Sequence, residues 1–307
     1  MTSSSDSPTT IDPLLSTLYE ALLESYNAST DFVGRDSDGN RYHSIRSMWL
    51  NQGVTLLMDG GSSSLNNTEN WYDRAQNFYE ENCPETVNGV LGGFGSISPV
   101  DLKASRSFLT TVQSKLPDTT DDIVTCDCGA GIGRITKDLL LEIPNVKRCD
   151  LVESSMRLLS AAPDYIGAKA DQCRYFCESL QDWVPPPNTY TIIWIQWVLI
   201  YLTDTDVIRF LRRCNDALLS NSSSIIVMKE NSCSITEDGL FVLDTEDASV
   251  TRSLPYLLKL IEAAGLEVVH QETQTNFPDD LFDVPMLAIQ RKNTSESKDG
   301  NISTNIT

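Results

Sequence analysis

Residues 127–134 read Asp-Cys-Gly-Ala-Gly-Ile-Gly-Arg, and this stretch decides the fold of the 307-residue chain. An apolar run at 123–127 leads into it, and residues 135–141 have the composition of a helix. Alternate glycines between a strand and a helix let the backbone approach a ligand closely at the helix N-terminus. A dinucleotide-binding turn has its third glycine three positions after the second, where this chain has Arg134. The stretch therefore predicts a cofactor-binding turn of another kind.

On both sides of this turn, short runs rich in β-branched residues alternate with helical patterns from Trp71 onward. The alternation is typical of a parallel sheet with helices on both faces. We expect strands at 123–127, 148–153, 173–177, 190–195, 224–229, 266–271 and 286–290. Thr203 and Asp206 have capping-box spacing and predict a helix after the fourth strand. The fold class is therefore α/β, with a seven-stranded, mostly parallel, Rossmann-like sheet, helices on both faces and an N-terminal helical extension.

Composition divides the chain into four segments. They are a helical extension 1–58, a flexible Gly/Ser/Asn-rich linker 59–70, a main domain 71–292 and a disordered polar tail 293–307. In the extension, Asp12 as N-cap and Pro13 as first residue predict a helix over 11–26 with a stripe of leucines. Residues 34–40 are polar and rich in turn formers, so we expect turns there.

The charge balance restricts the partners. The 23 basic and 43 acidic residues leave a formal net charge of -20. A nucleic acid or an anionic membrane would be repelled by this field, so we expect neither, whereas a cationic partner fits. The sequence shows no signal-peptide pattern and no stretch of about twenty apolar residues. We expect a monomer located in the cytoplasm and also in the nucleus.

Residue counts argue against two kinds of site. The chain has two histidines, His43 and His270, and both lie outside the segments that we assign to the active site. A hydrolase with a Ser/His or Cys/His arrangement is therefore disfavoured. The eight cysteines lack metal-ligand spacing, so we interpret them as reduced, buried side chains and expect no metal site.

Glu153 ends the second expected strand and gives the glycine turn an acidic neighbour. The strand, the turn and this acid together resemble the S-adenosylmethionine (SAM) motif of class I methyltransferases. In that family the turn holds the methionine part of SAM, and the acid accepts hydrogen bonds from the ribose hydroxyls. The resemblance implies SAM as the cofactor.

A wider resemblance covers residues 71–290, which are similar to the eukaryotic protein N-terminal methyltransferases. The segments that carry it are 90–95 (VLGGFG), 127–134 (DCGAGIGR), 193–197 (IWIQW) and 243–249 (LDTEDAS). In the extension, the pattern from Gly34 to Gly39 and the Met48-Trp49 pair resemble plant-type members of this family. The resemblance implies an enzyme that transfers methyl groups from SAM to the α-amine of proteins with basic X-Pro-Lys/Arg N-termini.

The resemblance also implies roles by position. Cofactor contacts are implied for Gly129, Gly131, Arg134, Glu153, Leu180, Gln181 and Gln196. Substrate contacts are implied for Leu91, Trp197, Asn231, Asp244, Asp247 and Ser249, and catalytic roles for Asp247, Tyr201 and Asn231. In this scheme Arg134 reaches the methionine carboxylate through a charge-assisted pair. Trp197 lies against the substrate proline, Asn231 holds a peptide carbonyl, and the carboxylates receive the amine or the basic third residue.

Two positions depart from the family. Tyr201 stands where the family has a histidine that helps to remove the proton of the amine. Glu80 aligns with an aromatic residue of the family, and a one-residue shift would put Phe78 or Tyr79 there. An α-amine has a pKa of about 7.7 to 8.0, so keeping it neutral near pH 7.4 costs only roughly 0.5 kcal/mol. A weak base therefore suffices, and Asp247 is the predicted proton acceptor.

Two alternatives to this function stay open. The same fold would serve a methyltransferase that acts on a small molecule. The tyrosine at position 201 would also suit a SAM-binding regulator without catalysis. The sequence predicts neither the number of methyl groups transferred nor the role of the extension.

Overall fold

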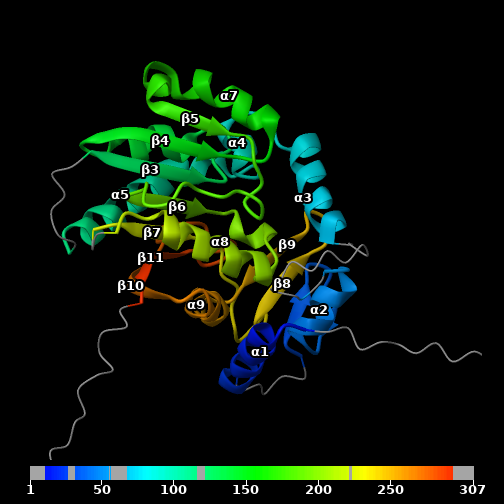
Figure 1. Cartoon of the computed structure of the whole chain (residues 1–307). Helices are drawn as coiled ribbons and strands as arrows, with labels where there is room; N and C mark the ends of the chain where they lie inside the picture. The colour runs from blue at the N-terminus through cyan, green and yellow to red at the C-terminus, as the bar shows by residue number, and fades with distance from the viewer. Residues whose placement is uncertain are drawn as a thin grey trace, which may run out of the picture.

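The computed structural model describes residues 11–26, 32–54, 56, 68–115, 122–220 and 223–292. A seven-stranded sheet in the order β10-β11-β7-β6-β3-β4-β5 lies at its centre (Figure 1). Its strands are β3 (Ile123–Cys128), β4 (Val146–Val152), β5 (Cys173–Phe176), β6 (Ile192–Gln196), β7 (Ile225–Lys229), β10 (Leu266–Thr273) and β11 (Pro285–Arg291). β11 is antiparallel to β7 and β10, and the other neighbouring pairs are parallel. All seven expected strands are confirmed, with small shifts at their ends.

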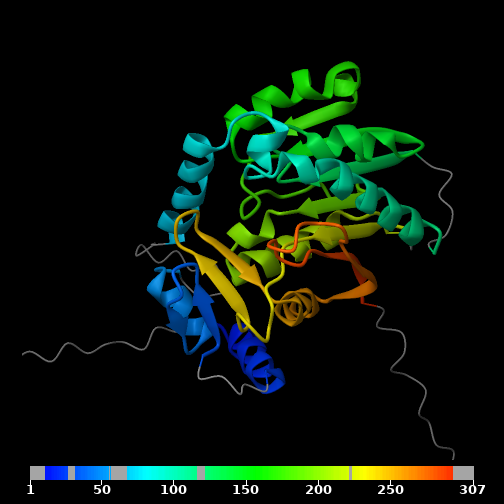
Figure 2. The ribbon, with the colours of Figure 1, turned by 180° about the vertical axis from the view of Figure 1, so that it is seen from behind.

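Helices cover both faces of this sheet because successive side chains of a strand point to opposite faces. Ile193 and Ile195 belong to one buried cluster, and Ile192 and Trp194 belong to another. The helices packed on the first cluster are α8 (Asp204–Ala217) and α9 (Leu254–Ala263); those on the second are α5 (Ser98–Gln113), α6 (Arg134–Asp138) and α7 (Met156–Ile166). Figures 1 and 2 show the sheet between these two layers. Thr203 caps α8 through its hydroxyl, as expected.

The order of the strands reverses between β3 and β6. β4 and β5 follow β3 on one side, and β7 lies beyond β6 on the other. In parallel α/β sheets such a reversal leaves a crevice at the carboxyl ends of the two strands. The glycine turn 129–133 follows β3, and Trp197 follows β6, so both meet at this crevice.

A second sheet was not expected from the sequence. Its order is β2-β1-β8-β9, and its strands are β1 (Gly34–Asp36), β2 (Arg41–Tyr42), β8 (Phe241–Asp244) and β9 (Ser249–Arg252). β1 runs parallel to β8, with Arg35 opposite Val242. The extension and the β8-β9 hairpin therefore share one sheet, and the stretch 34–40 holds β1 as well as the turn that leads to β2. Strands of two and three residues are too short to show an alternating pattern.

Three helices precede the main sheet: α1 (Pro13–Ser25), α2 (Ile45–Asn51) and α3 (Thr68–Asn82). α1 confirms the helix predicted over 11–26, because Asp12 accepts from the backbone N–H of Leu14 at 2.8 Å and Pro13 is the first residue. Its buried face holds Leu15, Leu18 and Leu22. Leu23 of the predicted stripe is exposed instead. Most of the segment 59–70 and the tail 293–307 lie outside the described residues, and residues 68–70 begin α3.

The remaining elements are short. They are α4 (Val87–Val90), η1 (Gly95–Ile97), η2 (Leu140–Glu142), η3 (Gly167–Gln172) and η4 (Leu199–Tyr201). The helix expected at 135–141 is interrupted, because Leu139 leaves the helical conformation with φ -132° and ψ -63°. All eight cysteines are free and six are buried, whereas Cys173 is half-buried and Cys177 is exposed, contrary to expectation. In the described part of the chain no helix has the length and apolar character to cross a membrane.

Candidate active site

A cavity opens at the crevice between β3 and β6, with about 1180 Å³ of empty space including its opening to solvent. The predicted site residues in its wall are Leu91, Gly129, Gly131, Arg134, Glu153, Leu180, Gln181, Gln196, Trp197 and Tyr201. The wall also holds Tyr72 and Tyr79 of α3. The other predicted residues, Asn231, Asp244, Asp247 and Ser249, lie outside this set of lining residues.

The glycine turn has the backbone conformation that its sequence requires. Gly129, Gly131 and Gly133 have φ angles of 73°, 54° and 80°, in the left-handed region that favours glycine. A Cβ atom at Gly129 would come within 2.7 Å of the Val198 side chain. The turn is tied to β4, because Gly129 donates its N–H to the carbonyl of Val152 at 2.9 Å. A side chain at Gly129 would therefore both strain the backbone and crowd the cavity wall.

Two buried carboxylates hold the ends of this turn. Asp127 Oδ2 accepts from the N–H and the hydroxyl of Thr136 at 3.0 and 2.6 Å, and burial raises the pKa of Asp127 to about 6. Glu153 Oε2 accepts from the N–H of Gly131 at 2.9 Å, and its Oε1 accepts from the N–H of Ser155 at 2.9 Å. Burial raises the pKa of Glu153. A carboxylate in the cavity wall has lone pairs left for donors such as ribose hydroxyls.

Asp101, which the sequence analysis missed, lies fully buried behind the turn. One of its oxygens accepts from Arg134 Nη1 at 2.7 Å, and the other lies 2.5 Å from Lys229 Nζ and 2.9 Å from Gln196 Nε2. Burial lowers the pKa of Lys229, and the charge of Asp101 opposes that shift. Two cationic side chains thus share one carboxylate. The surplus positive charge of this three-residue cluster reaches the cavity through Arg134, which fits an anionic group such as the carboxylate of SAM.

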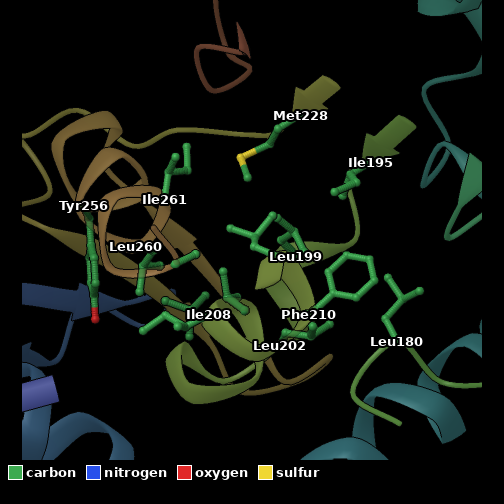
Figure 3. Close-up of a cluster of buried hydrophobic side chains, with 14 of the residues drawn as sticks. Leu180, Ile195, Leu199, Leu202, Ile208, Phe210, Met228, Tyr256, Leu260 and Ile261 are labelled. Atoms are coloured by element: carbon green, nitrogen blue, oxygen red, sulfur yellow. The ribbon is translucent and has the colours of Figure 1, made fainter. Parts of the chain in front are cut away.

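The segment 197–202 forms the opposite wall and has its backbone held from two directions. Glu230 Oε1 accepts from the N–H groups of Val198 and Leu199, both at 2.8 Å. Arg252 donates to the carbonyls of Leu199 at 3.1 Å and Leu202 at 2.7 Å. Figure 3 shows Leu199 and Leu202 within the hydrophobic cluster of α8 and α9. The backbone of this segment is therefore fixed by buried charged groups.

Tyr201 contacts Tyr79, and both residues belong to the cavity wall. Their hydroxyl oxygens lie 2.5 Å apart, and their rings meet edge to face at 5.3 Å. Burial raises the pKa of both phenols above the usual value of 10, so both are protonated at neutral pH. Tyr79 lines the cavity and Phe78 does not, which favours Tyr79 over Phe78.

Asp247 adjoins this tyrosine pair. Burial raises its pKa to about 6, and hydrogen bonds from Ser249 and Tyr201 oppose this shift. Its Oδ1 is buried and has no hydrogen-bond partner among the described residues. Asp244 contributes a nearby negative charge that raises the pKa of Asp247 further. Asp247, Ser249 and Tyr201 thus lie together, whereas Asn231 is half-buried after β7 and has no such link to them in the described contacts.

Most predicted residues line the cavity, but the charged residues that support its wall were not predicted from the sequence. Lys229 and Glu230 follow the apolar run of β7, and charged residues at the end of a buried strand were the available signal. Asp101 lies in the first turn of α5, where an acidic residue is ordinary at a helix N-terminus. Nothing in the sequence near Asp101 indicates its partners Arg134 and Lys229.

Comparisons with known proteins agree with this geometry. A family model described as AdoMet dependent proline di-methyltransferase matches residues 67–290. The human N-terminal Xaa-Pro-Lys N-methyltransferase 1 is 40% identical over 230 residues, which are 75% of this chain and 99% of that protein. The Xenopus laevis N-terminal Xaa-Pro-Lys N-methyltransferase 1-B is 42% identical over 221 residues, which are 72% and 95% of the two chains.

Solved structures extend the likeness to three dimensions. A SAM-dependent methyltransferase from Leishmania major is 35% identical with a TM-score of 0.70, covering 84% of this chain and 95% of its own. The phosphoethanolamine N-methyltransferase 1 of Haemonchus contortus, at 15% identity and a TM-score of 0.57, shares the fold alone; the match covers 74% of this chain and 50% of that one. The family match covers more than half of the chain, and the human relative is covered almost completely. The chain belongs to the AdoMet dependent proline di-methyltransferase family.

Proposed function

We propose that this protein transfers methyl groups to the α-amine of proteins whose N-termini begin Xaa-Pro-Lys or Xaa-Pro-Arg. The observation that carries the proposal is the half-buried Asp247, whose buried Oδ1 has no partner among the described contacts and which lies beside the tyrosine pair of the cavity wall. The relatives named N-terminal Xaa-Pro-Lys N-methyltransferase support the choice of acceptor.

The site has two halves under this proposal. We call the turn 129–134, Glu153 and residues 180–181 the cofactor half. These residues would hold SAM, together with Gln196, and the surplus charge at Arg134 would face its carboxylate. SAM, when bound, supplies a methyl group on a positively charged sulfur. We call the segment 197–202 and the loop 244–249 the peptide half.

Asp247 is the proposed proton acceptor. Its pKa of about 6 leaves it ionised at pH 7.4 and brings it within about two units of an α-amine. An ordinary aspartate, with a pKa of about 3.9, would lie roughly four units below the amine. The smaller gap lowers the cost of moving the proton by about 3 kcal/mol at 1.36 kcal/mol per unit. Burial thus makes Asp247 a better base without neutralising it.

The tyrosine pair gives Asp247 a fixed direction. Both phenols are protonated, and Tyr201 hydrogen-bonds to Asp247. In this proposal Tyr201 donates to Asp247, and Tyr79 then donates to the oxygen of Tyr201, which is one of the two directions that their contact allows. Asp247 Oδ1, which has no partner among the described contacts, is the proposed acceptor for the substrate amine. Tyr201 acts here as an orienting donor, in the place of the family histidine.

Substrate recognition follows from the remaining groups of the peptide half. Trp197 presents an indole whose ring lies 5.7 Å from the Arg134 guanidinium and 6.5 Å from the Phe277 ring, an aromatic wall suited to a proline. Asp247 would receive the amine end, Asp244 would receive the basic third residue, and Leu91 would cover the peptide. The net charge of -20 would draw a basic N-terminus toward the cavity.

The test is methylation of a peptide that begins Xaa-Pro-Lys, read by mass spectrometry of the product. We expect methyl groups on the α-amine and none on the same peptide with an acetylated N-terminus. Equal methylation of the acetylated peptide would place the acceptor on lysine and contradict the proposal. Binding of SAM and peptide without transfer would favour the non-catalytic regulator, which the departure at Tyr201 motivates.

A further inference from the structure

We propose that the N-terminal extension, described here as residues 11–26, 32–54 and 56, is a positioning element for the peptide half of the active site. The inference rests on the proposed function for the identity of the peptide. The family model begins at residue 67, so the extension lies before the region that this model matches. All residues that line the cavity lie between Tyr72 and Leu202, so the extension would act through other groups.

The first connection is a fully buried carboxylate in the first turn of α8. Asp204 Oδ2 accepts from Tyr19 of α1 and Trp49 of α2, both at 2.7 Å, and from Tyr256 of α9 at 2.5 Å. Its Oδ1 accepts from Arg252 Nε at 2.9 Å. Two of the four donors on this carboxylate therefore come from the extension.

Arg252 carries this connection to the cavity wall. While Nε is bound to Asp204, its two other nitrogens hold the carbonyls of Leu199 and Leu202, on either side of Tyr201. Arg252 is 1% exposed, so water does not compensate for a lost partner. A shift of Asp204 would therefore move Arg252 and, through it, the backbone of Tyr201.

The second connection is the pairing of β1 with β8. Asp36 pairs with Leu243, and Ser37 donates its N–H to the carbonyl of Leu243 at 2.8 Å. At the start of β8, Leu240 donates its N–H to the carbonyl of Val33 at 2.7 Å. β8 ends at Asp244, where the loop 244–249 begins. The extension thus fixes the strand that carries the acidic loop, up to the residue before it.

The third connection runs through α3. Trp49 packs edge to face on Trp71 at 5.2 Å, and Trp71 Nε1 donates to the carbonyl of Tyr201 at 2.7 Å. One turn further along, Arg74 donates to Gln52 Oε1 at 3.0 Å. α3 also carries Tyr79, the hydroxyl partner of Tyr201. The extension therefore supports both members of the tyrosine pair.

The cofactor half is held mainly by contacts of its own, with one link to α3 through Glu80, which accepts from the Ser155 hydroxyl at 2.5 Å. The glycine turn is bonded to Val152 and Glu153, and Glu153 is bonded to Ser155, all within or after β4. Weakening the extension should therefore loosen the peptide half and leave the cofactor half in place. This separation is a result that general destabilisation of the fold would not give.

The experiment uses the full-length chain with Tyr19→Phe and Trp49→Phe combined, which removes two donors to Asp204 and keeps aromatic rings. We expect kcat/KM for an Xaa-Pro-Lys peptide to fall at least tenfold, while the Kd for SAM stays within twofold of the parent. Tyr19→Phe alone should move the same quantities in the same direction by less. Hydrogen exchange should speed up in 197–202 and 244–249 and stay unchanged in 129–134.

Two matched controls separate positioning from loss of stability. Tyr42→Phe removes a hydroxyl from the same extension, where the ring packs on Phe241 at 5.8 Å, and should leave kcat/KM within twofold. Val112→Ala opens a space in the core on the other face of the sheet and should lower Tm without lowering kcat/KM. Equal losses in Val112→Ala at the same Tm, or a parallel loss of SAM binding in the double variant, would overturn the inference.

Failure of the proposed function would be visible separately. If the parent protein does not methylate the peptide, the choice of substrate is wrong. The extension is then judged by hydrogen exchange alone, where faster exchange confined to 197–202 and 244–249 supports it. Unchanged exchange in both segments overturns it.

Discussion

The two halves of the site are held by different kinds of contact. The cofactor half rests on contacts between segments close in the chain: the backbone hydrogen bond of Gly129 to Val152, glycines whose φ angles are positive, and the carboxylates of Asp127 and Glu153. The peptide half rests on buried charges and hydroxyls, among them Glu230, Arg252 and the pair of Tyr79 and Tyr201. The contacts of the cofactor half join segments close in the chain, whereas those of the peptide half join distant segments, such as Arg252 with Leu199. Substitutions at the distant contacts should therefore change the peptide half and spare the cofactor half.

The largest effect is expected for Asp247→Asn, which removes the proposed base and keeps the shape of the side chain. We expect kcat to fall by about 10³, within the range for a lost general base, with the Kd for SAM unchanged. Steady-state kinetics and calorimetry check the two halves separately. Asp244→Asn serves as the matched control and should raise the peptide KM with a much smaller change in kcat. If Asp247→Asn turns over as fast as the parent, Asp247 is not the proton acceptor.

Gly129→Ala should weaken SAM binding, with a smaller effect than that of Asp247→Asn on kcat. Alanine at this position would have to keep a φ of 73°, and its Cβ would lie 2.7 Å from the Val198 side chain. We expect SAM to bind about 100-fold more weakly, a loss of about 2.7 kcal/mol, as measured by calorimetry. Gly167→Ala has a similar φ of 74° and open space around it, so SAM binding should survive there. Equal losses in both variants would show that backbone strain alone is responsible.

Tyr201→Phe should change the pH dependence of the activity. In the parent, activity requires ionised Asp247 and should decline as the pH falls through about 6. The hydrogen bond from Tyr201 lowers the pKa of Asp247, so its removal raises that pKa. We expect kcat to fall about tenfold and the acidic midpoint of the pH profile to move upward. A profile with an unmoved midpoint would contradict a bond between these two groups.

The smallest effect is expected from salt. The net charge of -20 draws a basic peptide toward the cavity, and the Debye length shortens from about 14 Å at 50 mM salt to about 6 Å at 300 mM. The peptide KM should rise about threefold over this range, while the Kd for SAM changes less. An uncharged Xaa-Pro-Gln peptide is the control and should show a weaker dependence. Equal salt dependence of KM for both peptides would show that the acidic surface does not contribute to capture of the basic peptide.

The cofactor half could be predicted from the sequence because its parts are local. The turn 129–134 follows its own strand, and Glu153 closes the next one, so spacing alone relates them. The seven strands were predictable for the same reason, since each carries its own pattern. The resemblance to the family then assigned Trp197 and Asp247 by position, and their roles remain proposals.

The supporting contacts could not be predicted, because they join residues from distant parts of the chain. Asp204 is the first residue of α8, where an acidic side chain is ordinary, yet its donors come from α1, α2, β9 and α9. β1 is three residues long, and only its pairing with β2 and with the distant β8 makes it a strand. Asp101 and Lys229 likewise become partners only in the folded sheet.

The pairing of β1 with β8 also bears on the order in which the molecule is made. β1 lies near the start of the chain, and β8 emerges from the ribosome only after the strands β3 to β7. At a synthesis rate of about 5 to 20 residues per second, roughly 10 to 40 s separate the two strands. The parallel strands β3 to β7 of the main sheet are therefore synthesised before β1 can pair with β8. A nascent chain would thus gain the ability to hold SAM before it gains a finished surface for its substrate.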